Sequence, residues 1–258
     1  MLKKLVKYDL KWINKLMVVY FVIAVIFSLL TRISSLWTTS FAGNLLYQIL
    51  RGFTISAYAS CIITCAMRIW VRFRNNTYKD ESYLTHTLPV DKKTMYNSKI
   101  LSSLLSILLS LIVIIICFVI AFLNKDIINF LKETFSNKDF VFITISLILT
   151  FILEMIYMIN CGLIGILLGH RSNNKRTAKS IIYGLLLYFI MQAIILVIIY
   201  TIGLFVTDIK VMFETVFNPN LVVSMKKLLI IVDSIYLIFI IAMYFIGKMI
   251  YNKGVDVD

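Results

Sequence analysis

Six long apolar runs most constrain what this chain can fold into. They are separated by polar segments and lie near residues 16–33, 53–70, 100–123, 140–168, 181–206 and 228–246. Most of them approach the roughly 20 residues that an α-helix needs to cross about 30 Å of hydrocarbon. A membrane β-barrel would need alternating strands of about ten residues, and these runs are continuously apolar. The runs therefore predict an all-α membrane protein with six transmembrane helices.

The overall composition supports this class. The chain of 258 residues is 60% hydrophobic, whereas soluble domains are about half apolar. Its net charge of +13 comes from cations gathered at the ends of the apolar runs, as membrane topology requires. We therefore expect these charges to face the lipid bilayer and not nucleic acid. The four cysteines lie inside apolar runs without a second ligand pair, so no metal site or cofactor is expected on this chain.

The N-terminal segment 1–15 has a pattern of its own. Five lysines alternate there with apolar side chains, including Trp12, on a helical stripe. This pattern predicts an amphipathic helix in the plane of the membrane interface, followed by six spans over 16–246 and a tail over 247–258. The alternative is that the segment is the basic flank of a signal anchor. We expect residues 1–258 to form a single transmembrane domain.

The distribution of lysine and arginine predicts the orientation. With the N-terminus inside, the inner segments hold 18 of the 26 cationic side chains. The positive-inside rule then places both termini and the polar loop over residues 68–99 in the cytoplasm. The expected location is a cell membrane that the chain crosses several times.

The polar loop over residues 68–99 has the strongest local signals. Thr77, with Asp80 three residues later, fits a capping box, and Pro89 cannot continue a helix. A short amphipathic helix is therefore expected between them, with one face formed by Tyr83, Leu84, Thr87 and Leu88. Asp91 is placed to cap the next helix, which enters the third span. A helix of this kind outside the bilayer predicts a docking element.

The same loop carries a resemblance to a known family. Residues 80–90 read Asp-Glu-Ser-Tyr-Leu-Thr-His-Thr-Leu-Pro-Val and are followed by Ser98 and Lys99 at the mouth of a span. This string resembles the permease subunits of ABC transporters, in particular the small six-span permeases of Gram-positive bacteria in the type-2 exporter class. The chain departs from the family pattern at Ser82, where glycine is common, and at Asp91, where serine is common.

The resemblance implies a coupling helix over residues 78–90 that docks onto a separate ATP-binding subunit, which would hold ATP and Mg. The residues that it implies in this contact are Asp80, Glu81, Tyr83, Leu84, Thr87, Leu88 and Pro89. It also implies a second permease subunit, of the same or a homologous sequence, in a bacterial cell membrane. The expected function is ATP-driven export of a hydrophobic or amphipathic peptide, antibiotic or lipid, with resistance to antimicrobial peptides.

Polar residues inside the spans are costly in lipid and therefore informative. Glu154 lies midway along the fourth span, with Asn160 near it. Both are candidates for a substrate pathway or gate. The alternatives for Glu154 are a structural hydrogen bond between helices or a protonated glutamic acid. Gln192 in the fifth span is expected to join two helices in that way.

Two further features concern the end of the fourth span. Gly162, Gly165 and Gly169 form a face of small residues that predicts close approach of another helix. His170, in the short loop that follows, is expected to be a solvated residue.

The chain lacks the motifs of an enzyme. It has no Gly-x-x-x-x-Gly-Lys-Ser/Thr phosphate loop, no His-Glu-x-x-His zinc motif and no acid–base pair that suggests hydrolysis. ATPase activity is therefore expected on a partner chain. Two alternatives remain. One is a stand-alone membrane immunity or interaction protein, which would not need the docking helix. The other is an ion-coupled secondary transporter, which would depend on Glu154 and on internal repeat symmetry.

Overall fold

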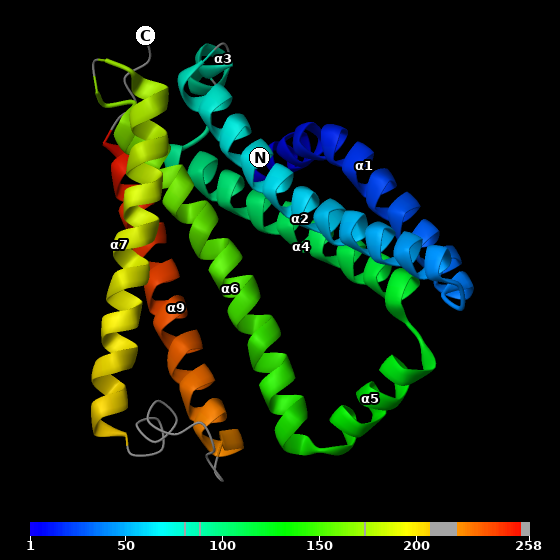
Figure 1. Cartoon of the computed structure of the whole chain (residues 1–258). Helices are drawn as coiled ribbons and strands as arrows, with labels where there is room; N and C mark the ends of the chain where they lie inside the picture. Colours follow the sequence, from blue (N-terminus) through cyan, green and yellow to red (C-terminus); the bar gives the residue numbers. More distant parts are fainter. Residues whose placement is uncertain (80, 88, 173, 207–220, 254–258) are drawn as a thin grey trace. The chain divides into compact units, whose positions relative to one another are not determined.

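The computed structural model describes all residues except 80, 88, 173, 207–220 and 254–258, and within that part the chain is helical with no strand. Six helices are long and apolar enough to cross a membrane. They are α1 (Leu2–Ser34), α2 (Phe41–Tyr78), α4 (Lys92–Phe122), α6 (Lys138–Gly169), α7 (Arg176–Phe205) and α9 (Leu221–Asn252) (Figure 1). The predicted fold class, an all-α membrane protein with six spans, is confirmed.

In the described residues, three short helices lie between the long ones: η1 (Ser35–Trp37), α3 (Ser82–Thr87) and α5 (Lys125–Ser136). Helix α3 lies in the polar loop where a short helix was predicted, whereas α5 was not predicted. Helix α2 begins well before its apolar run because Ser40 caps it, accepting a hydrogen bond from the Gly43 amide at 3.1 Å. The connection between the first two spans is therefore short.

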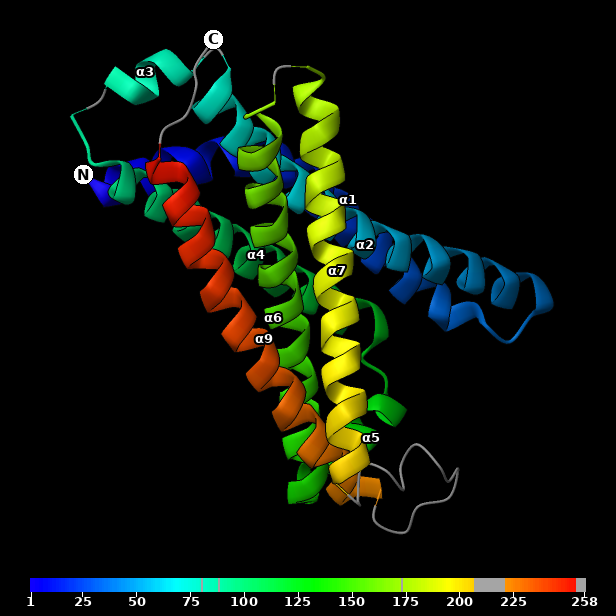
Figure 2. The ribbon, with the colours of Figure 1, turned by 90° about the vertical axis from the view of Figure 1, so that its left-hand side faces the viewer.

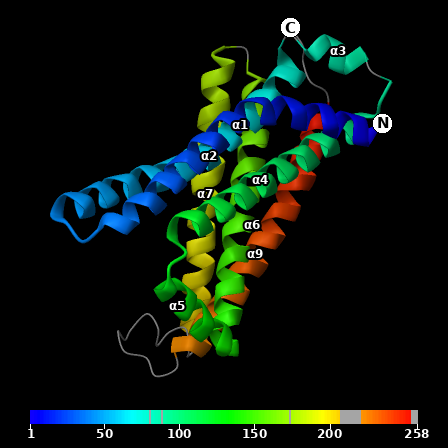
Figure 3. The same cartoon turned by 90° about the vertical axis from the view of Figure 1, so that its right-hand side faces the viewer.

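The amphipathic segment predicted over residues 1–15 is present, but it is not a separate element. It forms the first part of α1, which continues without a break into the first span (Figure 3). The reason is a buried stripe at helical spacing, with Val6, Ile13 and Met17 all less than a tenth exposed. This stripe packs on protein, so the segment is more than a membrane anchor.

The chain divides into two compact units, the first over Met1–Asn129 and the second beginning at Phe130. In the first unit α1 packs against both α2 and α4 (Figure 3). Much of this packing is polar: the hydroxyls of Ser28 and Tyr58 are 2.7 Å apart, and so are those of Thr31 and Thr54. Small hydroxyl side chains let helices approach closely and join them by hydrogen bonds.

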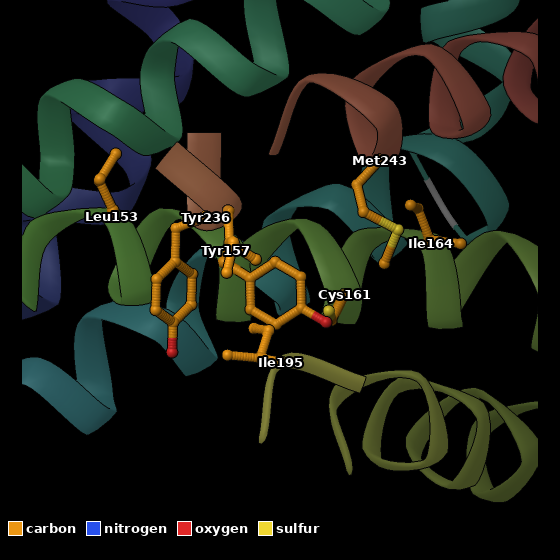
Figure 4. Packing of buried hydrophobic residues seen from close by; sticks show 8 residues of the cluster. Leu153, Tyr157, Cys161, Ile164, Ile195, Tyr236 and Met243 are labelled. Atoms are coloured by element: carbon orange, nitrogen blue, oxygen red, sulfur yellow. The ribbon is translucent and has the colours of Figure 1, made fainter. Parts of the chain in front are cut away.

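In the second unit α6 packs against both α7 and α9 (Figure 2). Its core is apolar and aromatic, built around Tyr157, which is fully buried among side chains that include Cys161, Ile195 and Tyr236 (Figure 4). The rings of Tyr157 and Tyr236 meet edge to face with their centroids 6.0 Å apart. Such aromatic pairs add to the free energy of packing beyond the area they bury.

The predicted small-residue face of α6 is confirmed by its contact with α7. A Cβ atom added to Gly165 would lie 2.5 Å from the backbone nitrogen of Gly184, and one added to Gly169 would collide with the backbone of Ser180. Real Cβ atoms do not approach other heavy atoms this closely, so only glycine permits the observed separation of α6 and α7.

Candidate functional site

The buried carboxylate of Asp9 is the centre of a polar cluster in the first unit. Asp9 lies in the buried stripe of α1 and is only 2% exposed. The ammonium of Lys99, at the start of α4, donates to both carboxylate oxygens at 2.9 and 2.8 Å. From α2, Arg72 Nε donates to Oδ1 at 2.9 Å and Asn76 Nδ2 to the same oxygen at 3.1 Å. One carboxylate thus joins three helices.

The charges of this cluster are balanced by a second acid. Arg72 Nη1 also donates to Glu81 Oε2 at 2.5 Å, so that two cations face two carboxylates. We call Asp9, Arg72, Asn76, Glu81 and Lys99 the ionic cluster. Desolvated charges are tolerated only when they are paired and hydrogen-bonded, and removing one partner of a buried pair costs about 3–5 kcal/mol. The cluster therefore holds the polar ends of α1, α2 and α4 in one arrangement.

Glu81 connects the cluster to α3. It occupies the turn before this helix, where its carbonyl accepts hydrogen bonds from the Thr85 amide at 3.0 Å and the Thr85 hydroxyl at 2.8 Å. Its side chain is 42% exposed, unlike that of Asp9 at 3%. The first turn of α3 is therefore tied through Arg72 to a carboxylate on α1.

An aromatic contact supports the same arginine-rich face of α2. The guanidinium carbon of Arg68 lies 3.7 Å from the ring centroid of Trp12, and that of Arg72 lies 5.2 Å from it. Arg68 also donates to the Trp12 carbonyl at 3.2 Å. The ring of Trp12 therefore stacks on the arginine side chains of α2, a contact that stabilises a desolvated cation.

Helix α3 exposes part of its surface. Tyr83 is 74% exposed, and Thr87 and Pro89 are exposed as well, whereas Ser82 is buried. Asp80 and Leu88, both predicted for the docking contact, lie outside the described residues, as does the side chain of Leu84. The predicted residues that can be placed therefore divide into Glu81, which is paired within the chain, and an outward-facing group on and after α3.

Two predictions about helix ends in this loop have different outcomes. The capping role of Thr77 is wrong, because α2 extends to Tyr78 and buries Thr77 in its last turn at 1% exposure. Asp91 does precede the first residue of α4, as predicted, but its carboxylate makes no capping hydrogen bond. The loop is consequently shorter than predicted, and α3 is joined closely to α2.

The sequence reasoning missed the centre of the cluster. Arg72 and Lys99 were counted as loop cations that set the topology, and Asp9 was not singled out. One signal was available: Asp9 is the only acidic residue in segment 1–15, and it lies on the same helical face as Val6 and Ile13. An acid on a buried stripe requires a cationic partner.

The second unit contains the other predicted site residues. Glu154 on α6 is partly buried and accepts a hydrogen bond from the Tyr188 hydroxyl of α7 at 3.1 Å. Asn160 is 4% exposed, and its Oδ1 has no hydrogen-bond partner among the described residues. No hydrogen bond in that part of the chain joins the two. Glu154 thus makes the hydrogen bond between helices that was the alternative to a role in a substrate pathway.

Two other polar predictions can be decided in this unit. The interhelical role of Gln192 is confirmed by its hydrogen bond to the Tyr236 hydroxyl of α9 at 3.2 Å. The expectation that His170 is solvated is wrong. It is 7% exposed, with Nδ1 at 3.0 Å from the Ile166 carbonyl and 3.1 Å from the Ser180 hydroxyl, because α7 packs closely over the end of α6.

Comparisons of the chain with protein-family models, with curated proteins and with solved structures find no match. The fold and the site together define a multi-pass helical membrane protein with a short exposed helix tied to a buried ionic cluster.

Proposed function

We propose that this chain is the membrane-spanning permease subunit of an ATP-driven ABC exporter, with α3 as its contact for a separate ATP-binding subunit. One observation carries the proposal. Helix α3 exposes Tyr83 from a loop between two spanning helices, while Arg72 ties the first turn of α3 to the buried carboxylate of Asp9. An exposed helix with a rigid link to the spans is what a force-transmitting contact requires.

The ionic cluster supplies a physical route for that force. Arg72 shares its guanidinium between Asp9 and Glu81, and Lys99 adds α4 to the same carboxylate. Because separating buried charges is costly, α3 and the ends of three helices would move together when a partner displaces α3. This role differs from the polar contact with the partner that was predicted for Glu81.

The remaining parts of the proposal rest on the resemblance of residues 80–90. They are a second permease subunit, a bacterial cell membrane with both termini in the cytoplasm, and ATP with Mg on the partner chain. The proposed substrate is a hydrophobic or amphipathic peptide, antibiotic or lipid, and the expected phenotype is resistance to antimicrobial peptides. Glu154 and Asn160 would lie along the substrate pathway.

The test is co-purification of the tagged chain from its native cell in mild detergent. An ATP-binding protein in stoichiometric amount is expected for the unaltered chain, and a large loss is expected for Tyr83→Ala and Leu84→Asp. Tyr8→Ala is the matched control, because Tyr8 is 67% exposed on α1 and should leave the complex intact. A solitary chain in every preparation would contradict the proposal and favour a stand-alone immunity protein.

A second candidate, an ion-coupled transporter, is favoured by the hydrogen bond that Glu154 makes with Tyr188 within the spans. Ionisable residues at membrane depth commonly mark proton or ion pathways. Transport in reconstituted vesicles separates the two candidates. Dependence on ATP supports the exporter, whatever the effect of Glu154→Gln on the rate. Dependence on a proton gradient, with that dependence lost in Glu154→Gln, supports the ion-coupled protein.

A further inference from the structure

Helix α5 has two contrasting faces. Ile127, Ile128, Leu131 and Phe135 recur at the spacing of one helical face, and the charged residues lie on the other. The apolar side is open: Leu131 is 38% and Phe135 is 66% exposed. No other helix in the described part of the chain packs along α5.

The short connections at both ends of α5 determine where the helix can lie relative to the membrane. Only Leu123 and Asn124 separate α5 from the end of α4, and only Asn137 separates it from the start of α6. Both neighbouring helices are long and apolar enough to cross a membrane. A helix of this length spans about 18 Å at 1.5 Å per residue. Since both its ends are tied to spans, α5 must stay at the membrane surface.

The first turn of α5 is also held in place by α1. Arg32, in the last turn of α1, donates to the Leu123 carbonyl at 3.0 Å and to the side chain of Asn124. The carbonyl of Asn124 then accepts a hydrogen bond from the Ile128 amide at 3.0 Å, which starts α5. The beginning of the helix is thus attached to the ends of two spans.

The charges of α5 indicate which property of the membrane it recognises. Its charged residues are Lys125, Asp126, Lys132 and Glu133, which sum to zero. An anionic surface therefore has little attraction for it, unlike the lysine-rich start of α1. The apolar face is left as the source of affinity.

We infer that α5 is a membrane-surface helix whose apolar face enters the acyl-chain boundary of the leaflet opposite the polar loop. The opposite leaflet follows because α4 starts beside that loop and crosses before α5 begins. The partner is phospholipid acyl chain, not a protein, and the inference does not rest on the proposed transport function.

The test uses nitroxide labels on the full chain in phosphatidylcholine nanodiscs. Single changes Leu131→Cys and Phe135→Cys report on the apolar face, and Lys132→Cys and Glu133→Cys are the matched controls on the polar face. The four native cysteines are all buried, so that labelling of the introduced thiol needs no cysteine-free background, and the unaltered chain serves as the blank.

The expected result is a severalfold higher ratio of oxygen to nickel-chelate collision rates at 131 and 135 than at 132 and 133. Equal access of the chelate to all four positions would overturn the inference, because α5 would then lie in water. Shielding of 131 and 135 from both reagents would overturn it too, since protein would cover the face. Adding phosphatidylglycerol should leave the ratios unchanged; a marked increase would show that headgroup charge, not apolar burial, drives the contact.

Discussion

In each unit the first long helix packs against two other long helices, but the side chains that hold these helices together differ. In the first unit a small apolar cluster is joined by hydroxyl pairs and by the ionic cluster around Asp9. In the second the contacts are aromatic rings and the close approach of Gly165 to Gly184. A charge pair is lost when either partner loses its charge, whereas the glycine contact is lost when a larger side chain is introduced. Similar helix arrangements can therefore be destabilised by different changes: loss of a charge in the first unit and added side-chain volume in the second.

The cysteines allow each unit to be followed separately. Cys61, Cys65 and Cys117 are buried in the first unit and Cys161 is buried in the second. The rate at which each thiol reacts with maleimide on heating, read by mass spectrometry, therefore reports the stability of its own unit. The predictions below use this readout.

The largest effect is expected for Asp9→Asn. The change removes the carboxylate from two cations of which Lys99 is only 7% exposed, and should destabilise the first unit by about 3–5 kcal/mol. The thiols of Cys61 and Cys65 should then react at markedly lower temperature, and that of Cys161 should not. Asp139→Asn is the control, since Asp139 pairs with Lys226 at the surface and its loss is worth about 0–1 kcal/mol. Equal effects of the two changes would contradict the importance of the ionic cluster.

A smaller effect, confined to the second unit, is expected for Gly165→Ala. The added methyl group meets the Gly184 backbone and must separate α6 from α7, at a cost of about 1–3 kcal/mol. The reaction of Cys161 should start at lower temperature. Gly184→Ala is the matched control, because its Cβ would lie 3.6 Å from the nearest atoms, an ordinary contact. If both changes were tolerated equally, close backbone approach would not be what holds this unit.

Glu81→Gln should change the stability of the first unit little but should strongly increase the opening of α3. The side chain is partly exposed, so loss of its pair with Arg72 is worth about 0–1 kcal/mol. The expected result is faster amide hydrogen exchange in α3 with unchanged reaction of Cys61. Unchanged exchange in α3 would show that Arg72 does not hold this helix, and the proposed route for force would fail.

The smallest effects are expected for single interhelical hydrogen bonds, and they should be alike in the two units. Thr31→Val removes the bond to Thr54, and Gln192→Leu removes the bond to Tyr236. Such bonds in membrane proteins are worth about 0.6 kcal/mol. A much larger loss for Thr31→Val would mean that hydroxyl pairs, as well as charges, distinguish the first unit.

The helical class could be predicted from the sequence because long apolar runs leave few alternatives in lipid. The helix in the polar loop could be predicted because Pro89 and Asp91 mark its end and the start of α4. Helix α5 was not predicted, since its apolar residues are too few for a span and lie in one of the polar segments between the apolar runs.

The ionic cluster could not be predicted from local pattern because its members come from distant parts of the chain. Asp9 and Lys99 are brought together only when α1 packs on α4, and each looks like an ordinary flanking charge in its own segment. Thr77 and His170 were misjudged for a related reason: residues that look like loop positions become buried when neighbouring helices extend over them.

The order of Asp9 and its partners along the chain has a consequence for biosynthesis. Asp9 precedes all of its partners in the sequence, so that it is synthesised before them. Arg72 arrives with the second span and Lys99 only with the third. The ionic cluster can therefore be completed only after α4 has been made, and until then Arg72 and Asn76 of α2 are the partners available to the Asp9 carboxylate.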